Sequence, residues 1–227
     1  MREQLIRQLR ALPLPRQEPG ESIPLESEAF RLLFPCGISR GTLTEWLSEG
    51  EGSGTETLTM KLASNLRGTL LIVDSGHNFY PPAAAALGLA LSETIVLRPR
   101  RETDSLWAIE QSLRCRGVGA VLARLNHLES REFRRLQLAA ERGGTVGVFL
   151  RPARLRASPS WAQARFLVRP LPSQPPNSQP LGRRLQIESL HFDGRDVVEL
   201  ELNDATGSLR LVTRMAHPAI TRRAAGA

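Results

Sequence analysis

Short apolar runs alternate with helix-like segments through the middle of this chain, and this alternation limits the possible folds more than any other feature. Continuous runs of apolar or β-forming residues occur at residues 43–47, 69–74, 94–97, 117–125 and 145–151. Runs of this length are typical of strands that are buried on both faces of a sheet. Apolar residues at helical spacing lie between them, at residues 58–65, 83–87, 103–114 and 131–142. The sequence therefore predicts an α/β fold with a mostly parallel sheet sandwiched by helices.

A different pattern begins near residue 165, where strand-like segments follow one another without helices. The segments at residues 164–171, 183–192, 196–204 and 208–215 each predict a strand. Asp193 and Gly194 lie between two of them, and an Asp-Gly pair in that position favours a hairpin turn. Residues 170–180 are rich in Pro, Ser and Gln, which predicts a flexible loop. We expect a β-rich C-terminal end, followed by a disordered tail at residues 217–227.

The N-terminal segment predicts a helical arm and linker at residues 1–33, ahead of the α/β domain at residues 34–216. Residues 1–12 form a helical pattern that ends before Pro13, with an apolar stripe of Leu5, Ile6 and Leu9. Residues 16–26 are polar and rich in Glu and Pro, which is typical of a linker. We expect the helix to lie outside the main core and to act as a docking arm for self-association or for a partner.

Charge and cysteine content limit the classes of partner and site. The chain has 30 Lys and Arg against 23 Asp and Glu, a formal charge of +7. A basic balance favours nucleic acid or an acidic partner, whereas an arginine-rich proteome from a GC-rich genome explains it equally well. Cys36 and Cys115 have no metal-ligand spacing, so we expect no metal and a reduced, cytoplasmic setting. No apolar run approaches the ~18 residues of a membrane span, and we expect no membrane partner.

A glycine-rich loop at residues 49–57 is the candidate site for chemistry. It lies between a predicted strand and a predicted helix, where backbone N–H groups and a helix N-terminus can hold phosphate. Its candidate site residues are Gly50, Gly52, Ser53, Gly54, Thr55, Glu56 and Thr57. A nucleotide-binding loop also needs Lys on the phosphates and Ser or Thr on Mg²⁺, but these positions fall on Thr55 and Glu56. Taken alone, the loop is equally consistent with a protein that binds no nucleotide.

Four segments in order resemble the RecA family. GISRGTLTEWL followed by GSGTETL resembles the entry to the RecA phosphate-binding loop, and VDSGHNFYPPAAAALGL resembles the strand, His-containing loop and helix that come next. DSLWAIEQSLRCRGVGAVLARL resembles the helix and the Walker B strand, and TVGVFLRP resembles the strand before the DNA-binding loop. The matches span residues 37–170. This resemblance implies a RecA-like P-loop fold.

Finer details resemble the ImuA family. The segments concerned are FYPPAAAALGL, LWAIEQSLRCRGVGAVLA, RRLQLAAERGG, FLRP and PSWAQARFLVRPLPS. ImuA proteins are RecA-like accessory factors of damage-induced mutagenesis. They work with ImuB, a relative of the Y-family polymerases, and with an error-prone DNA polymerase. The resemblance therefore implies an ImuB-like protein and an error-prone DNA polymerase as partners.

The departures from the RecA pattern predict a degenerate ATPase site. Gly76 stands at the position of the catalytic Glu, two residues after Asp74, and a glycine cannot act as a general base. Arg124 ends the Walker B strand, where an acidic residue should help to hold Mg²⁺. Arg151 replaces a phosphate-sensing Gln. We therefore expect no catalytic residue, no cofactor and no use of ATP, and we expect Asp74 to fix its loop by hydrogen bonds.

A short basic loop follows the last strand of the α/β pattern. Arg151, Arg154 and Arg156 lie where RecA has its DNA-binding loop, and they are the candidate contacts for single-stranded DNA or for a protein partner. Trp46 is expected in the core. Trp161 is expected to pack against its neighbours, with stacking on a base as the alternative.

The sequence favours a non-hydrolysing RecA-like accessory protein in DNA repair and SOS translesion synthesis. A weak DNA-dependent ATPase or nucleotide switch is the first alternative, and a sizeable affinity for ATP would favour it. A SulA-like inhibitor of cell division is the second, and binding to a division protein instead of a polymerase relative would select it.

Overall fold

The computed structural model describes the whole chain except residues 14–19, 51, 173–181, 191–196, 204–206 and 216–227. The Asp193–Gly194 turn, the expected tail and most of the Pro-rich loop lie outside the described residues. The expected loop starts too early, because Pro170 and Leu171 still belong to a strand. Within the described residues, no helix combines the length and the apolar character needed to cross a membrane.

Parallel strands form the centre of the molecule. They are β3 (Leu43–Ser48), β4 (Thr69–Val73), β5 (Thr94–Leu97), β6 (Val118–Arg124), β7 (Val146–Pro152) and β8 (Ala164–Leu171). Their spatial order is β8-β3-β7-β6-β4-β5, with every neighbouring pair parallel. The predicted α/β class with a mostly parallel sheet is confirmed.

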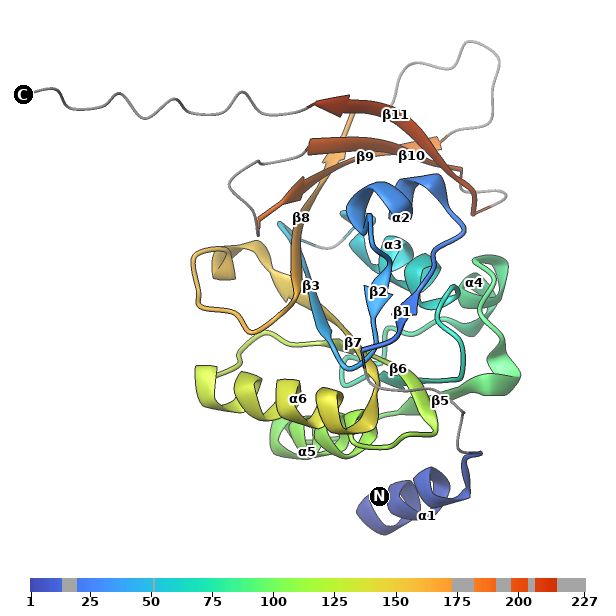
Figure 1. Ribbon diagram of the computed structural model, residues 1–227, viewed down its shortest axis with the longest axis vertical. Helices are drawn as coiled ribbons and strands as arrows, with labels where there is room; N and C mark the ends of the chain where they lie inside the picture. The colour runs from blue at the N-terminus through green and yellow to red at the C-terminus, as the bar shows by residue number, and fades with distance from the viewer. Residues whose placement is uncertain (14–19, 51, 173–181, 191–196, 204–206, 216–227) are drawn as a thin grey trace, which may run out of the picture.

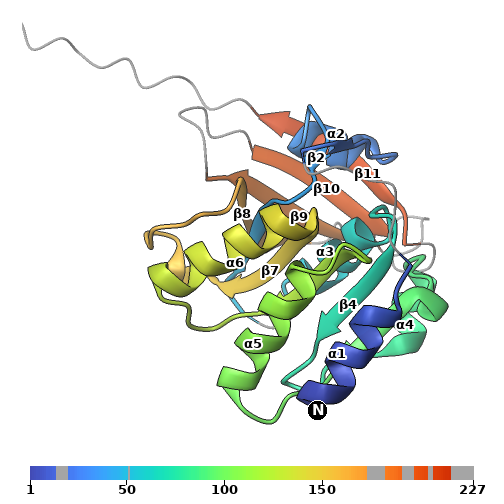
Figure 2. The same ribbon diagram turned by 60° about the horizontal axis from the view of Figure 1, so that its bottom comes forward.

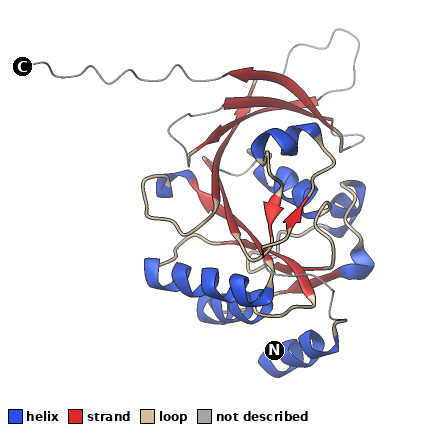
Figure 3. Cartoon of the chain, viewed as in Figure 1, coloured by secondary structure: helices blue, strands red, loops and turns tan. Residues whose placement is uncertain are grey.

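An antiparallel meander extends this sheet beyond β8 (Figure 1). It consists of β9 (Gly182–Ser189), β10 (Val197–Asn203) and β11 (Leu209–Met215). Together with the parallel strands it makes a nine-stranded sheet within the described part of the chain. The meander curves away from the parallel part at one end of the molecule (Figure 3). The C-terminal end is β-rich, as the sequence predicted.

Helices cover both faces of the sheet. On one face lie α2 (Glu28–Leu33), α3 (Thr55–Ala63) and α4 (Pro81–Ala86), whose buried residues share a core with Trp46 and Phe166 of the sheet. On the other face lie α5 (Glu102–Leu113) and α6 (Ser130–Gly143), which share a second core with Leu43 and Phe149 (Figure 2). Trp46 is fully buried, as expected. The parallel sheet is therefore sandwiched by helices.

Local sequence defines the bounds of α6. Glu129 and Glu132 form a capping box at its start. The Glu129 side chain accepts the backbone N–H of Glu132, and the Glu132 side chain accepts the backbone N–H of Glu129. Gly144, with φ 68°, ends the helix in the left-handed conformation that favours glycine. Phe133, Leu136 and Ala140 are buried against the sheet, at the helical spacing that predicted them.

The N-terminal helix packs on the domain, so the expectation that it lies outside the core is wrong. In α1 (Arg2–Ala11), Leu5 is 1% exposed and Leu9 is 8% exposed, and both belong to the core beside α5. Arg2 pairs with Asp104 at 2.7 Å and lies over the ring of Trp107. The physical reason is that the apolar stripe of α1 packs into the core to which α5 contributes. Figure 2 shows α1 and α5 near each other.

The linker interpretation of residues 16–26 is wrong from residue 20 onward. The short strand β1 (Ser22–Ile23) pairs with β2 (Ile38–Ser39), and Ile23 and Leu25 are buried. Phe30 of α2 is fully buried in the same core as Trp46. The described part of the expected linker therefore contributes to the same core as the α/β domain.

Candidate functional site

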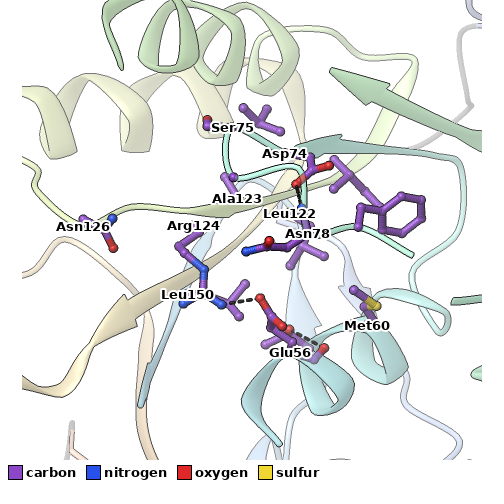
Figure 4. Close-up of a pocket in the computed structure, with 15 residues that line it drawn as sticks. Glu56, Met60, Asp74, Ser75, Asn78, Leu122, Ala123, Arg124, Asn126 and Leu150 are labelled. Atoms are coloured by element: carbon purple, nitrogen blue, oxygen red, sulfur yellow. Dashed lines mark hydrogen bonds and ion pairs between the residues drawn. The ribbon is translucent and has the colours of Figure 1, made fainter. Parts of the chain in front are cut away.

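The connections that leave β4 and β6 cross to opposite faces of the sheet. β4 leads to α4 on one face, and β6 leads to α6 on the other. In open α/β sheets, ligands bind at such a switch point, outside the carboxyl ends of the strands. A cavity of about 290 Å³ lies there, between α3, the loop after β4 and the end of β6 (Figure 4). Its position makes it the candidate functional site.

The glycine-rich loop connects β3 to α3, as predicted, and lies beside this cavity. Gly54 has φ 78° and is the N-cap of α3, which begins at Thr55. The hydroxyls of Ser53 and Thr55 lie 2.8 Å apart, and both residues are buried. A Cβ on Gly54 would lie 2.7 Å from Cδ2 of Leu185 in β9, so the meander packs directly on the loop.

Two hollows border the loop. The larger measures about 500 Å³ and lies between residues 48–50, Arg124, Asn126 and residues 152–154. The smaller measures about 100 Å³ and is lined by Gly50, Gly52, Ser53, Gly54, Thr55, Glu56 and Thr57, together with Ser48, Arg124 and Arg183. Small-molecule sites usually measure ~300 Å³ or more. The predicted loop residues therefore gather in one place, around the smaller hollow, and the larger hollow adjoins them.

An ion pair between Arg124 and Glu56 joins the two sides of the site. Arg124 ends β6, Glu56 lies in the first turn of α3, and the guanidinium donates to the carboxylate (Figure 4). The RecA resemblance implies an acid at the position of Arg124 and a hydroxyl at the position of Glu56. Near a protein surface, two like unit charges 4 Å apart repel by ~4 kcal/mol. A metal ion placed here would meet the positive charge of Arg124.

Asp74 holds the loop after β4, as expected. Its buried carboxylate accepts the backbone N–H of Asn78 at 2.8 Å and pairs with Nε of Arg98 at 3.1 Å. Gly76 and His77 follow in an exposed turn, where His77 has φ 57°. In the part of the chain that the structure covers, no group of three or more His, Cys, Asp and Glu gathers as a metal site would require.

Arg151 is buried, so its assignment to an exposed binding loop is wrong. It is 3% exposed and pairs with Glu45 of β3, which is fully buried. Arg165 of β8 pairs with the same carboxylate at 2.5 Å, and the Ser160 hydroxyl donates to it at 2.7 Å. The sequence placed Arg151 correctly at the end of a strand, but the pairing depends on β3 lying between β7 and β8.

Arg154 and Arg156 are exposed but point to different partners. Arg154 donates to the carbonyl oxygen of Asn126 at 3.1 Å, and Arg156 pairs with Glu188 of β9 at 3.2 Å. Trp161, on the loop that follows them, is 44% exposed, and the Arg134 guanidinium lies 4.6 Å from its ring centroid. The loop therefore keeps two surface arginines, and the alternative interpretation of Trp161 as a surface residue fits its position.

If this loop contacts single-stranded DNA, Arg154→Ala with Arg156→Ala should reduce the salt dependence of that binding. Each phosphate contact on a single strand contributes ~0.7 to the slope of log K against log salt, so two lost contacts lower it by about 1.4. Fluorescence anisotropy with an oligothymidine at several salt concentrations measures this slope. Arg142→Ala, an exposed position at the far end of α6, is the matched control. An unchanged slope in the double variant would exclude this loop as a phosphate contact.

Sequence reasoning did not single out the apolar lining of the cavity. Met60, Ile72, Phe79, Leu122 and Leu150 come from α3, β4, the loop after β4, β6 and β7. Each belongs to an ordinary core pattern in its own segment. The cavity arises where the connections after β4 and β6 go to opposite faces of the sheet, and the sequence pattern does not contain that information.

Comparison with known proteins places the chain beside one family. No family model matches it. It is 33% identical over 118 residues to the proteins named ImuA of two Caulobacter vibrioides strains, NA1000/CB15N and CB15. The match covers 48% of this chain and 48% of each relative, so the chain spans about half the length of the curated relatives it matches. Over that half, the chain is similar to ImuA.

Proposed function

We propose that this chain is a non-hydrolysing accessory protein of damage-induced mutagenesis. It would act as an adaptor for an ImuB-like protein and an error-prone DNA polymerase, which are the partners that the ImuA resemblance implies. The identity to ImuA over half of each chain supports this role. The lack of a carboxylate at Gly76 and the charge of Arg124 argue against an ATPase.

The Arg124–Glu56 ion pair is the observation that carries the non-hydrolysing part of the proposal. A phosphoryl-transfer site of this class needs a cation held between a hydroxyl and an acid. This chain has a carboxylate and a guanidinium instead, and they neutralise each other. The interaction that a metal and phosphate would supply is thus replaced by one within the chain.

We further propose that the α/β domain is of the RecA type. The support is the order of β3, a glycine-rich loop and α3, within a parallel sheet covered on both faces. The fold by itself does not define an activity. It supplies a rigid frame on which the loops after β4 and β6 present a docking surface.

We expect the purified chain to bind an ImuB-like protein without nucleotide and to hydrolyse no ATP, with or without single-stranded DNA. Thr55→Lys should also remain inactive, because the general base and the acid on the metal side are still missing. Phosphate release measures hydrolysis, and calorimetric titration measures partner binding. DNA-stimulated turnover that Gly54→Ala abolishes would contradict the proposal, as would the absence of partner binding.

A further inference from the structure

The cavity at the switch point combines an apolar floor with a polar rim. Ile72, Leu122, Phe79 and Leu150 are each less than 9% exposed and form the floor with half-buried Met60. Arg124, Asn78 and Asn126 lie along the rim, and the carboxamide of Asn78 and the guanidinium of Arg124 point toward the cavity (Figure 4). A volume of about 290 Å³ is at the small end for ligand sites and suits one large apolar side chain.

An arginine-rich segment follows β5 next to one side of this rim. Arg98, with a side chain 48% exposed, pairs with Asp74 at the edge of the cavity. Arg100 and Arg101 follow it and are exposed, and the described residues include no ion pair or hydrogen bond of their side chains. The Ser75 and Ser105 hydroxyls, 3.0 Å apart, join the cavity edge to the first turn of α5, where Arg101 is the N-cap.

Most of the nearby negative charge is already neutralised. Asp74 is paired with Arg98, and Glu56 is paired with Arg124. Glu102 is exposed at the start of α5 beside Arg101. The charges left over beside this rim are therefore Arg100, Arg101 and Glu102, a positive excess that complements an acidic ligand.

We propose that this cavity is the docking site for a short acidic segment of a protein partner. One Leu or Phe side chain of the segment fills the cavity, one flanking carboxylate pairs with Arg100 and Arg101, and another takes the place of Glu56 on Arg124. Interfaces of this kind depend on a buried apolar anchor within a charged rim. The inference names the partner chemistry of the candidate site and rests on the proposed adaptor function.

A peptide fits the floor better than a nucleic-acid base does. Bases bind by stacking on exposed aromatic rings, whereas Phe79 is the one aromatic side chain that lines this cavity and it is 8% exposed. The remaining floor is aliphatic, apart from the thioether of Met60. A half-buried Met adapts its shape to different apolar side chains.

The test is a titration of the ¹⁵N-labelled chain with a synthetic decapeptide in which Asp and Glu flank a Leu-Phe pair. Two matched peptides serve as controls: in one, Lys replaces every Asp and Glu, and in the other, Ser replaces both Leu and Phe. A twelve-nucleotide oligothymidine is the nucleic-acid probe. We expect the acidic peptide to shift the amides of Met60, Asn78 and Arg124, and both matched peptides to bind at least about tenfold more weakly.

Two substitutions on the rim should each lower the affinity for the acidic peptide by about tenfold. Arg124→Glu reverses the charge, and Asn78→Trp fills the cavity from an exposed position. Arg67→Glu, exposed just before β4 at the opposite edge of the sheet, should change the affinity by less than about twofold. Melting temperatures of all three variants show whether the fold is intact.

The outcomes separate the two proposals. No amide shift at millimolar peptide, or equal binding by the Lys peptide, overturns the docking site. The docking site also fails if the oligothymidine shifts these amides and the rim variants reduce binding of the oligonucleotide but not of the peptide. That result would identify a nucleic-acid surface. Binding of an ImuB-like protein that Arg124→Glu and Asn78→Trp leave unchanged would overturn the docking site and keep the adaptor function. Peptide binding as described, without binding of an ImuB-like protein, would keep the site and overturn the function.

Discussion

Replacing Glu45 by Gln should lower the melting temperature by about 6–20 °C, because it leaves two buried arginines without their shared negative charge. Loss of one partner from a buried ion pair reduces the free energy of unfolding by ~3–5 kcal/mol, and each kcal/mol corresponds to ~2–4 °C in a chain of this size. Glu45 is fully buried, and Arg151 and Arg165 are 3% and 8% exposed. Thermal unfolding followed by circular dichroism measures the effect.

A control and a rescue make this expectation specific. Glu93→Gln removes an exposed carboxylate that pairs with none of the residues the structure describes, and it should change stability by less than ~0.5 kcal/mol. Adding Arg151→Met to Glu45→Gln should recover part of the lost stability, since one fewer buried charge is uncompensated. If Glu45→Gln melts within about 2 °C of the wild type, the cluster contributes no more than a surface ion pair.

Shortening Leu5 to Ala should lower the melting temperature by about 4–20 °C. A fully buried Leu→Ala substitution costs ~2–5 kcal/mol, because apolar contacts are lost and a cavity remains. Leu5 is 1% exposed and packs in the core beside α5. Gln8→Ala, on the exposed face of the same helix, is the control and should leave the melting temperature nearly unchanged.

The same variant decides between two roles for α1. A helix that belongs to the core loses stability with Leu5→Ala in a monomer at any protein concentration. A docking arm keeps its melting temperature and loses self-association, which sedimentation velocity detects. Only the second result would restore the expectation drawn from the sequence.

Local patterns were sufficient to predict most of the secondary structure of the α/β part. The strand at residues 94–97 has the predicted bounds, and the helix predicted at residues 131–142 differs by one residue at each end. The continuous apolar runs mark strands that are buried on both faces, which is a property of each segment by itself. The glycine-rich loop was also predicted between a strand and a helix, because the turn and the helix start depend on neighbouring residues.

Only the tertiary structure decided which charges meet. Arg124 and Glu56 are 68 residues apart, and Glu45 and Arg151 are 106 apart, so no local pattern relates them. The amphipathic stripe of α1 was visible in the sequence, but its partner surface on α5 was not. Burial depends on what a second element covers, and that depends on the order of strands in the sheet. The sequence by itself determined the elements, their class and the resemblance to ImuA. Because β3 packs between β7 and β8, Arg151 is an interior residue, and because α1 packs on α5, so is Leu5. The tertiary structure also places Arg124, at the end of β6, at the edge of a cavity.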